Sequence, residues 1–133
     1  MLLPSLTKTQ KLILFLLYKF RFITIHQFQK LLNHKDSRRI KEWLKDLKEK
    51  KYVYAIKDDK DVTKPYIYCL DTKARYILKE SDDCDTAFLG RLYKEKTLTQ
   101  NFINHCLFIV DIYLFFLSRK EKDENLHFLT QQD

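Results

Sequence analysis

The chain has 133 residues, 45% of them hydrophobic and 14% aromatic, with 32% charged residues and a formal net charge of +7. This length suits one domain, or one small domain with an extension, and so much apolar mass excludes a disordered chain. One glycine and two prolines exclude glycine-rich phosphate loops and argue against a turn-rich β-sandwich. We therefore expect an α+β protein that is mainly helical.

The positive charge is concentrated in the first part of the chain. Residues 1–80 hold 19 lysines and arginines against 9 aspartates and glutamates, a net charge of +10. Residues 81–133 hold 6 against 9, a net charge of −3. This asymmetry suggests that the first part meets a polyanion and that the second part has another role.

Cysteine, histidine and apolar patterns indicate a cytoplasmic protein without a metal or cofactor. The three cysteines form no CxxC pair, and no histidine has a His or Cys ligand at a metal-binding spacing. The longest apolar run, residues 106–117, has twelve residues and contains Asp111, whereas a bilayer span needs about 20. No cleavage site for a signal peptide follows the apolar residues 12–18, so we expect no membrane attachment.

Two Thr-x-x-Gln segments predict the starts of the first two helices. Residues 7–10 (TKTQ) and 24–27 (TIHQ) fit capping boxes, in which the threonine and glutamine side chains satisfy each other's backbone amides. The first box opens a mostly apolar helix over 8–20. The second opens a short helix over 25–32, with a stub of strand before it at 22–23.

A third helix over 38–50 has the clearest amphipathic pattern. Its N-cap is Asp36 or Ser37, and its apolar residues at 40, 43, 44 and 47 form one stripe. Two helices joined by a short turn, the second with a basic outer face, are typical of a helix-turn-helix. The polar side of this helix carries Ser37, Arg38, Lys41, Lys45 and Lys48.

A hairpin with a long tip follows this helix directly. Residues 52–56 and 66–70 alternate and are rich in β-formers, and the polar loop between them is too long for a two-residue turn. We interpret the hairpin as a wing and its four tyrosines as packing residues rather than as a platform for base stacking. Residues 57–64 have no net charge, so the tip is either a solvated loop or a DNA contact through Lys57, Lys60 and Lys64.

The pattern predicts a winged helix-turn-helix over 5–80, then an acidic linker and short helix over 81–97, then a long apolar helix and terminal segment over 98–133. A short helix capped by Asp71 ends the first part. A third capping box at 97–100 opens the long helix, 98–118, and a strand is expected at 126–129. Asp111 is expected to be buried and hydrogen-bonded rather than catalytic.

The long helix presents two apolar stripes with 4-3 spacing, yet the winged-helix core can cover only one of them. A two-fold homodimer would bury the other and align two recognition helices on one face of DNA. The alternative is that residues after 118 cover it. The residues expected to form the dimer are Phe102, Cys106, Ile109, Val110, Tyr113, Leu114, Phe116 and Leu117.

Double-stranded DNA is therefore the expected partner. Arg38 or Arg39 would contact guanine with two hydrogen bonds, while Lys41 and Lys45 would contact phosphates or a base edge. We find no arrangement of residues that indicates an enzyme. The competing interpretation is a winged-helix adaptor that binds proteins and not DNA.

Four segments resemble the replication-relaxation family: LTKTQKLILFLLYKFRFITIHQFQKLL, SRRIKEWLKDLKEKKYVYAIK, KPYIYCLDTKARYIL and NHCLFIVDIYLFFL. The resemblance covers most of residues 5–118 and rests on hydrophobic spacing and an Asn-His pair, here Asn104 and His105. It implies winged-helix proteins of plasmids and mobile elements that bind DNA in replication, transfer or transcriptional control, with replication or transfer proteins as partners. It supplies no catalytic motif.

Overall fold

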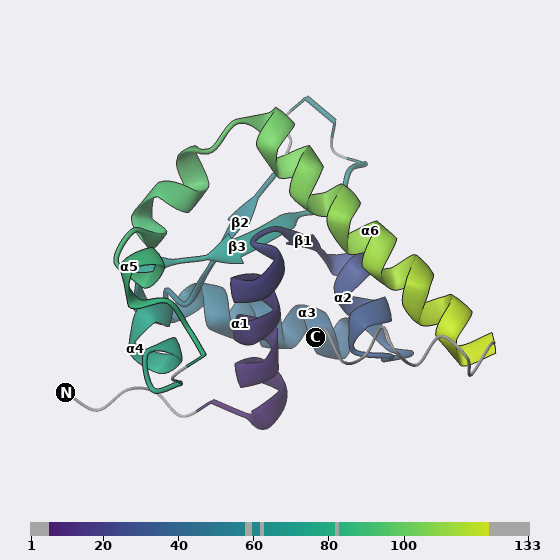
Figure 1. Cartoon of the computed structure of the whole chain (residues 1–133), viewed down its shortest axis with the longest axis horizontal. Helices are drawn as coiled ribbons and strands as arrows, with labels where there is room; N and C mark the ends of the chain where they lie inside the picture. The colour runs from purple at the N-terminus through teal and green to yellow at the C-terminus, as the bar shows by residue number, and fades with distance from the viewer. Residues whose placement is uncertain (1–5, 58–59, 62, 82, 123–133) are drawn as a thin grey trace.

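A three-stranded sheet and the helices around it make up the computed structural model, which describes residues 6–57, 60–61, 63–81 and 83–122 (Figure 1). Most predicted helices and strands are present within one or two residues of the predicted bounds. In chain order the elements are α1 (Lys8–Phe20), β1 (Ile23–Thr24), α2 (Ile25–Leu31), α3 (Ser37–Glu49), β2 (Val53–Ile56), β3 (Ile67–Leu70), the 3₁₀-helix η1 (Thr72–Ala74), α4 (Arg75–Leu78), α5 (Thr86–Leu89), the 3₁₀-helix η2 (Leu92–Thr97) and α6 (Gln100–Lys122).

The sheet has the strand order β1-β3-β2, with both neighbouring pairs antiparallel. β2 and β3 form the predicted hairpin, with Ile56 opposite Ile67. The strand stub predicted before the second helix is β1, and its Ile23 lies opposite Tyr68 of β3. A helix-turn-helix of α2 and α3 followed by this hairpin is a winged helix, and the long helix α6 follows it, as the predicted fold class requires.

The first two predicted capping boxes are confirmed. Thr7 accepts a hydrogen bond from the Gln10 amide and Gln10 accepts one from the Thr7 amide, both at 3.1 Å. Thr24 and Gln27 repeat this exchange at 3.2 and 3.0 Å. Since each box satisfies two amides that a helix start leaves without partners, both helices begin at the predicted positions.

The third predicted capping box, at residues 97–100, is wrong. Thr97 belongs to η2, and its hydroxyl donates to the Lys94 carbonyl. Thr99 accepts from the Phe102 amide instead, so α6 begins at Gln100. The 3₁₀ turn before α6 uses the hydroxyl on which the predicted box depended.

Each capping glutamine also ties its helix to a distant one. The Gln10 Nε2 donates to the Asp46 carboxylate of α3 at 2.8 Å. The Gln27 Nε2 donates to the Asp111 carboxylate and the Leu107 carbonyl of α6 at 2.9 and 3.0 Å. Asp111 is therefore hydrogen-bonded as predicted, but the residue is exposed and not buried.

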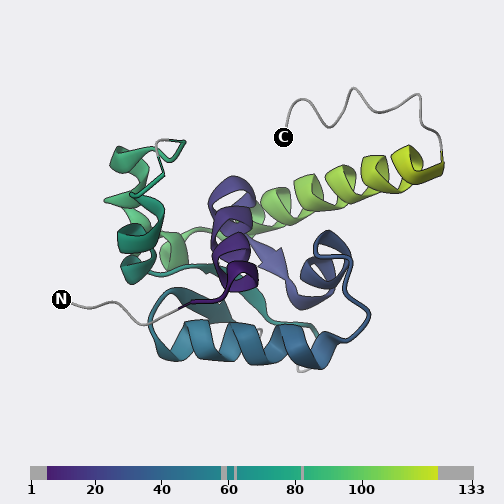
Figure 2. The ribbon, with the colours of Figure 1, turned by 90° about the horizontal axis from the view of Figure 1, so that it is seen from below.

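The core lies around α1, which has α3 on one side and α6 on the other (Figure 2). Ile13, Leu14 and Leu17 of α1 have no exposed surface. Leu89 of α5 and Leu92 of η2 belong to the same core. The segment expected to be an acidic linker thus packs on the winged helix through its apolar residues.

An ion pair between a partly exposed arginine and a buried glutamate holds this C-terminal part at the end of α1. Arg21 lies at the C-cap of α1, and its guanidinium donates to the Glu95 carboxylate, whose side chain is 3% exposed. The guanidinium also lies 5.1 Å from the Phe88 ring centre and 4.8 Å from that of Phe102. One side chain therefore connects α1 to α5, η2 and α6.

Two other expectations need adjustment. Asp71 caps the next helical segment through the Thr72 amide as expected, but that segment is the 3₁₀-helix η1 followed by α4 rather than one helix. The strand expected at 126–129 lies outside the described residues.

Candidate nucleic-acid interface

The N-cap of the recognition helix α3 is Asp36, one of the two residues that the sequence allowed. Its carboxylate accepts a hydrogen bond from the Arg38 amide at 2.9 Å, and this bond holds the pKa of the carboxyl below its usual range. Ser37 is then the first helical residue. Because the cap fixes which residue begins the helix, it also fixes how the two arginines point.

Arg38 and Arg39 point to different surroundings. The Arg38 side chain is 86% exposed, and its Nε lies 3.4 Å from the Asp36 carboxylate. The Arg39 guanidinium lies over the ring of Trp43, 5.7 Å from its centre, on the flank where His34 also meets that ring. Both arginines are exposed, but of the two predicted guanine contacts only Arg39 has its guanidinium over a ring of the described residues.

The predicted lysine stripe of α3, defined as Lys41, Lys45 and Lys48, is exposed along the helix. None of the three has a carboxylate partner among the described residues. Three acidic residues of α3 could neutralise the stripe. Asp46 lies on the opposite flank, where Lys50 and Gln10 bind its carboxylate, and Glu42 and Glu49 form no ion pair with the stripe lysines among the described residues. The stripe therefore keeps its positive charge.

A groove of about 510 Å³ runs beside this stripe, between α2, α3 and the base of the hairpin. A second hollow of about 310 Å³ continues along α3 past Lys48 to Ala55. The groove brings the stripe together with polar residues of α2 and with the strand that leads into β3. It is lined by Ile25, His26, Gln29, Ser37, Lys41, Lys45, Lys64, Pro65, Tyr66 and Tyr68.

Sequence reasoning missed His26 and Gln29 as interface residues. They lie three apart on α2, where His26 is exposed and Gln29 is half-buried, and both line the groove beside Ile25. That spacing is the available signal, because polar residues at i and i+3 share one helix face. Their role depends on α3 and the hairpin, which only the fold brings opposite them.

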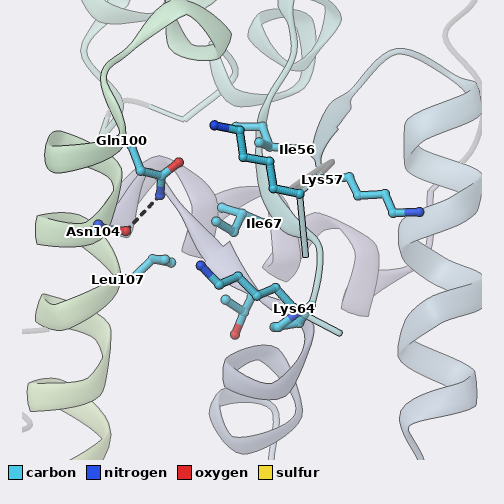
Figure 3. Close-up of a pocket in the computed structure, with 10 residues that line it drawn as sticks. Ile56, Lys57, Lys64, Ile67, Gln100, Asn104 and Leu107 are labelled. Atoms are coloured by element: carbon cyan, nitrogen blue, oxygen red, sulfur yellow. Dashed lines mark hydrogen bonds between the residues drawn. The ribbon is translucent and has the colours of Figure 1, made fainter. Parts of the chain in front are cut away.

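All three predicted wing lysines line a cleft between the hairpin and α6 (Figure 3). Lys64 also lines the groove beside α3. The Lys57 ammonium lies 5.8 Å from the centre of the Tyr66 ring.

The hairpin tyrosines divide between packing and surface. Tyr52 and Tyr68 are buried, as the packing interpretation predicted, whereas Tyr54 and Tyr66 are exposed. The Tyr66 and Tyr68 rings are 6.3 Å apart at the groove. Of the four, Tyr66 is therefore the exposed ring beside the lysine stripe.

The helix α6 has one docked face and one exposed apolar face. Ile103, Cys106 and Val110 are buried against the rest of the chain, and α6 contacts α1, α2 and β1. The exposed face, called here the outer stripe, includes Phe108 and Phe115, which are 61% and 60% exposed. The whole outer stripe is Phe108, Ile109, Ile112, Phe115 and Phe116.

This arrangement corrects the predicted dimer residues. Cys106 and Val110 are buried within the protomer, so they cannot contact a second copy while α6 stays docked. Phe102, Tyr113, Leu114 and Leu117 are half-buried. Of the eight predicted residues, Ile109 and Phe116 are on the outer stripe. The two stripes predicted from sequence overlooked a third 4-3 stripe, made by Phe108, Ile112 and Phe115.

The described part of the chain has no candidate metal site, and its cysteine thiols are buried. No group of three His, Cys, Asp or Glu residues there could hold a metal ion. The three cysteines are buried and unpaired, and burial raises the pKa of Cys69 to about 12. One described helix, α6 over Gln100–Lys120, is long and apolar enough to cross a membrane by length and composition alone.

Solved structures share the fold of this chain. A ZitR variant from Lactococcus lactis is 22% identical, with a TM-score of 0.50, over 87% of this chain and 75% of that one. The adhesin competence repressor AdcR from Streptococcus pyogenes is 24% identical, with a TM-score of 0.50, over 87% and 82%. These similarities agree with the winged-helix fold of this chain.

The family follows from the sequence comparison. Residues 14–131 match the replication-relaxation family, and the chain belongs to it. The comparison with curated proteins gives no match. The family assignment agrees with the resemblance found in the sequence.

Proposed function

We propose that this protein binds double-stranded DNA, with α3 in the major groove and the hairpin beside it. The observation that carries the proposal is the exposed lysine stripe of α3, which has no carboxylate partner in the described part of the chain and borders a groove of about 510 Å³. Unneutralised lysines in a row along an exposed helix are suited to phosphate binding, because they release the counterions of DNA.

The proposed contacts are of two kinds: contacts to phosphates, which position α3 on the DNA, and contacts to bases, which give sequence specificity. The stripe lysines and Lys64 bind phosphates and set the position of α3. Arg38, exposed in the first turn of α3, reads guanine with two hydrogen bonds. His26 and Gln29, across the groove, are close enough to the same DNA edge to contribute further contacts.

The protein acts as a homodimer through the outer stripe of α6. Soluble monomers rarely expose a contiguous patch of this kind, which holds three phenylalanines and two isoleucines on one face. A two-fold contact buries the same stripe on both copies and places two α3 helices for two half-sites. Docking of the opposite face of α6 on the winged helix supports a cytoplasmic protein rather than a membrane-spanning one.

We propose that this DNA binding serves replication or transfer of a plasmid or mobile element, or its transcriptional control, and membership of the replication-relaxation family supports this. The proposal assigns no catalytic role to the chain. Which DNA sequence is bound can be found by selecting bound duplexes from a random pool.

The test is fluorescence anisotropy with a random duplex over a range of salt. About five phosphate contacts per domain give a log–log slope of about −4 to −5. The triple variant Lys41→Ala/Lys45→Ala/Lys48→Ala should reduce that slope by about three units. The matched control Lys79→Ala/Arg91→Ala/Lys94→Ala removes the same charge from exposed positions away from α3 and should leave the slope nearly unchanged.

Two outcomes contradict the proposal. One is an affinity that does not change between low and moderate salt. The other is an equal loss in both triple variants, which would mean that net charge alone attracts DNA. Absence of any binding would favour the protein adaptor, for which a wing tip with no net charge is suited.

A further inference from the structure

A hollow of about 330 Å³ lies between the two short helices α4 and α5, which are on the side of α1 away from α6 (Figure 1). None of its lining residues lines the groove beside α3. The volume is at the small end of the range of about 300–1,000 Å³ typical of small-molecule sites. The lining comes from the two helices and the residues that end them: Arg75, Tyr76, Lys79, Thr86, Leu89 and Gly90.

The charged residues that line this hollow are both positive. Arg75 and Lys79 are exposed, and neither has a carboxylate partner among the described residues. Of the described acidic residues between α4 and α5, Asp83 and Asp85 line a different hollow beside α1. Two cations that no carboxylate neutralises at one opening attract an anion.

Tyr76 holds these two cations close together and adds a donor of its own. The Arg75 guanidinium and the Lys79 ammonium lie 4.8 and 5.2 Å from the centre of the Tyr76 ring. The Arg75 Nη2 donates to the Tyr76 hydroxyl at 2.8 Å, which leaves the hydrogen of that hydroxyl to bind another acceptor. The same hydrogen bond and the positive charges around it lower the pKa of Tyr76.

The polar groups of the hollow are suited to a phosphate group. Besides the two cations, the hydroxyls of Tyr76 and Thr86 line it, and no carboxylate does so in the described part of the chain. A phosphate monoester has three terminal oxygens and a charge near −2 at neutral pH. It therefore accepts more of these charge-assisted hydrogen bonds than a carboxylate, which has two oxygens and one charge.

Gly90, the one glycine of the chain, also lines the hollow. Its φ is −70°, which any residue adopts, so the backbone does not require a glycine. A Cβ there would meet the Ala87 and Thr86 carbonyl oxygens at 3.6 Å, an ordinary contact, so packing does not require one either. What the missing side chain does is leave the hollow open and let a ligand approach the backbone.

We propose that the hollow between α4 and α5 binds a dianionic phosphate group, either free phosphate or the monoester of a small molecule. The proposal does not depend on the DNA binding proposed above, because the two sites share no residue.

The test is NMR of the full chain with nitrogen-15 in glycine only, which gives a single backbone amide signal, that of Gly90. The probes are glycerol 3-phosphate, inorganic phosphate, dimethyl phosphate and acetate at equal ionic strength and pH 7.5. We expect the two dianions to shift the signal with a Kd on the order of 1 mM. Dimethyl phosphate and acetate, which have one charge each, should bind at least about tenfold more weakly.

The first two probes distinguish the sources of the phosphate. Tighter binding of glycerol 3-phosphate identifies the ligand as a monoester, and equal binding identifies it as free phosphate.

Variants locate the site. Arg75→Gln/Lys79→Gln should remove the saturable shift, whereas the matched control Lys8→Gln/Lys11→Gln removes the same charge from exposed positions on α1 and should keep the Kd. Gly90→Ala should fold normally, since its Cβ fits, and should bind several-fold more weakly, as followed through the Thr86 amide of the uniformly labelled chain.

A Gly90 signal that does not shift, or that shifts equally with all four anions, would overturn the site. An equal loss in the two double variants would also overturn it, because net charge alone would then attract the anions. An unchanged Kd in Gly90→Ala would overturn the part assigned to the glycine.

Discussion

The helices α3 and α6 each bury one apolar face against the same fold, yet they expose opposite chemistry. The buried face of α3 includes Ile40, Leu44 and Leu47, and its exposed side carries the lysine stripe. The buried face of α6 includes Ile103 and Val110, and its exposed side is the apolar outer stripe.

The difference between the two helices separates two kinds of surface. A lysine stripe is stable in water without a partner, so α3 can remain fully hydrated until the proposed DNA contact forms. The outer stripe of α6 leaves aromatic area in water, which is unfavourable at about 25 cal/mol for each Å². The first surface suits a reversible, salt-dependent contact, and the second suits a lasting contact with a second copy of the chain.

The largest expected effect comes from breaking the attachment of α6. Arg21→Met leaves the buried Glu95 carboxylate without its partner, which should lower the free energy of unfolding by about 3–5 kcal/mol. Urea denaturation at fixed protein concentration measures it. The double variant Arg21→Met/Glu95→Gln should recover most of the loss, and an equal loss in the double variant would contradict the role of the ion pair.

The next largest effect tests the outer stripe of α6. Phe115→Glu places a charge in the proposed dimer contact and should weaken self-association by about 2–4 kcal/mol. Sedimentation or light scattering at micromolar concentration measures it. Tyr93→Glu changes another exposed aromatic, on η2, and should leave the assembly intact. A monomeric unmodified chain would reject the dimer.

A smaller effect distinguishes the two arginines of α3. Arg38→Ala should weaken binding to a selected DNA sequence by about 1–3 kcal/mol, because in the proposed complex its exposed guanidinium contacts a base. Arg39→Ala should have a smaller effect on DNA and a measurable effect on folding, since that guanidinium lies over Trp43. Anisotropy and thermal denaturation separate the two, and the reverse ranking would contradict the assigned orientation.

The smallest effect concerns the inner flank of α3. Hydrogen bonds from Lys50 and Gln10 lower the pKa of Asp46 in the folded chain. A lowered folded-state pKa contributes stability above the ordinary value, near pH 4, and that contribution is lost as the pH falls through the folded-state pKa. Asp46→Asn should therefore lower stability at neutral pH by about 1 kcal/mol or less and flatten its acid dependence.

DNA binding supplies the control for this variant. Because Asp46 lies on the flank away from the stripe, Asp46→Asn should leave the salt slope unchanged. Denaturation followed over a range of acidic pH values measures the first effect and anisotropy the second. A slope that becomes steeper would show that this carboxylate neutralises the lysines.

Local patterns were enough to predict the winged-helix fold and the exposed lysine stripe of α3. Capping boxes and apolar spacing act over a few residues, so α1, α2, α3 and the hairpin could be located in the sequence. The lysine stripe follows from the same spacing, because residues opposite a buried stripe must face solvent. The box at 97–100 was wrong since a 3₁₀ turn uses the Thr97 hydroxyl, and nothing in the four-residue motif signals that turn.

The sequence by itself determined the winged helix, the basic face of α3 and the family. Only the tertiary structure decided which face of α6 stays outside, that Gln27 and Arg21 bind α6 and η2, and that Lys64 lines two hollows at once. The sequence of a helix that is apolar on most sides does not show which face is buried, because several rotations about the helix axis bury a similar apolar area. The rotation is set by a few polar contacts and by the shape of the core. The polar contacts, Arg21 with Glu95 and Gln27 with Asp111, join residues more than seventy positions apart in the chain.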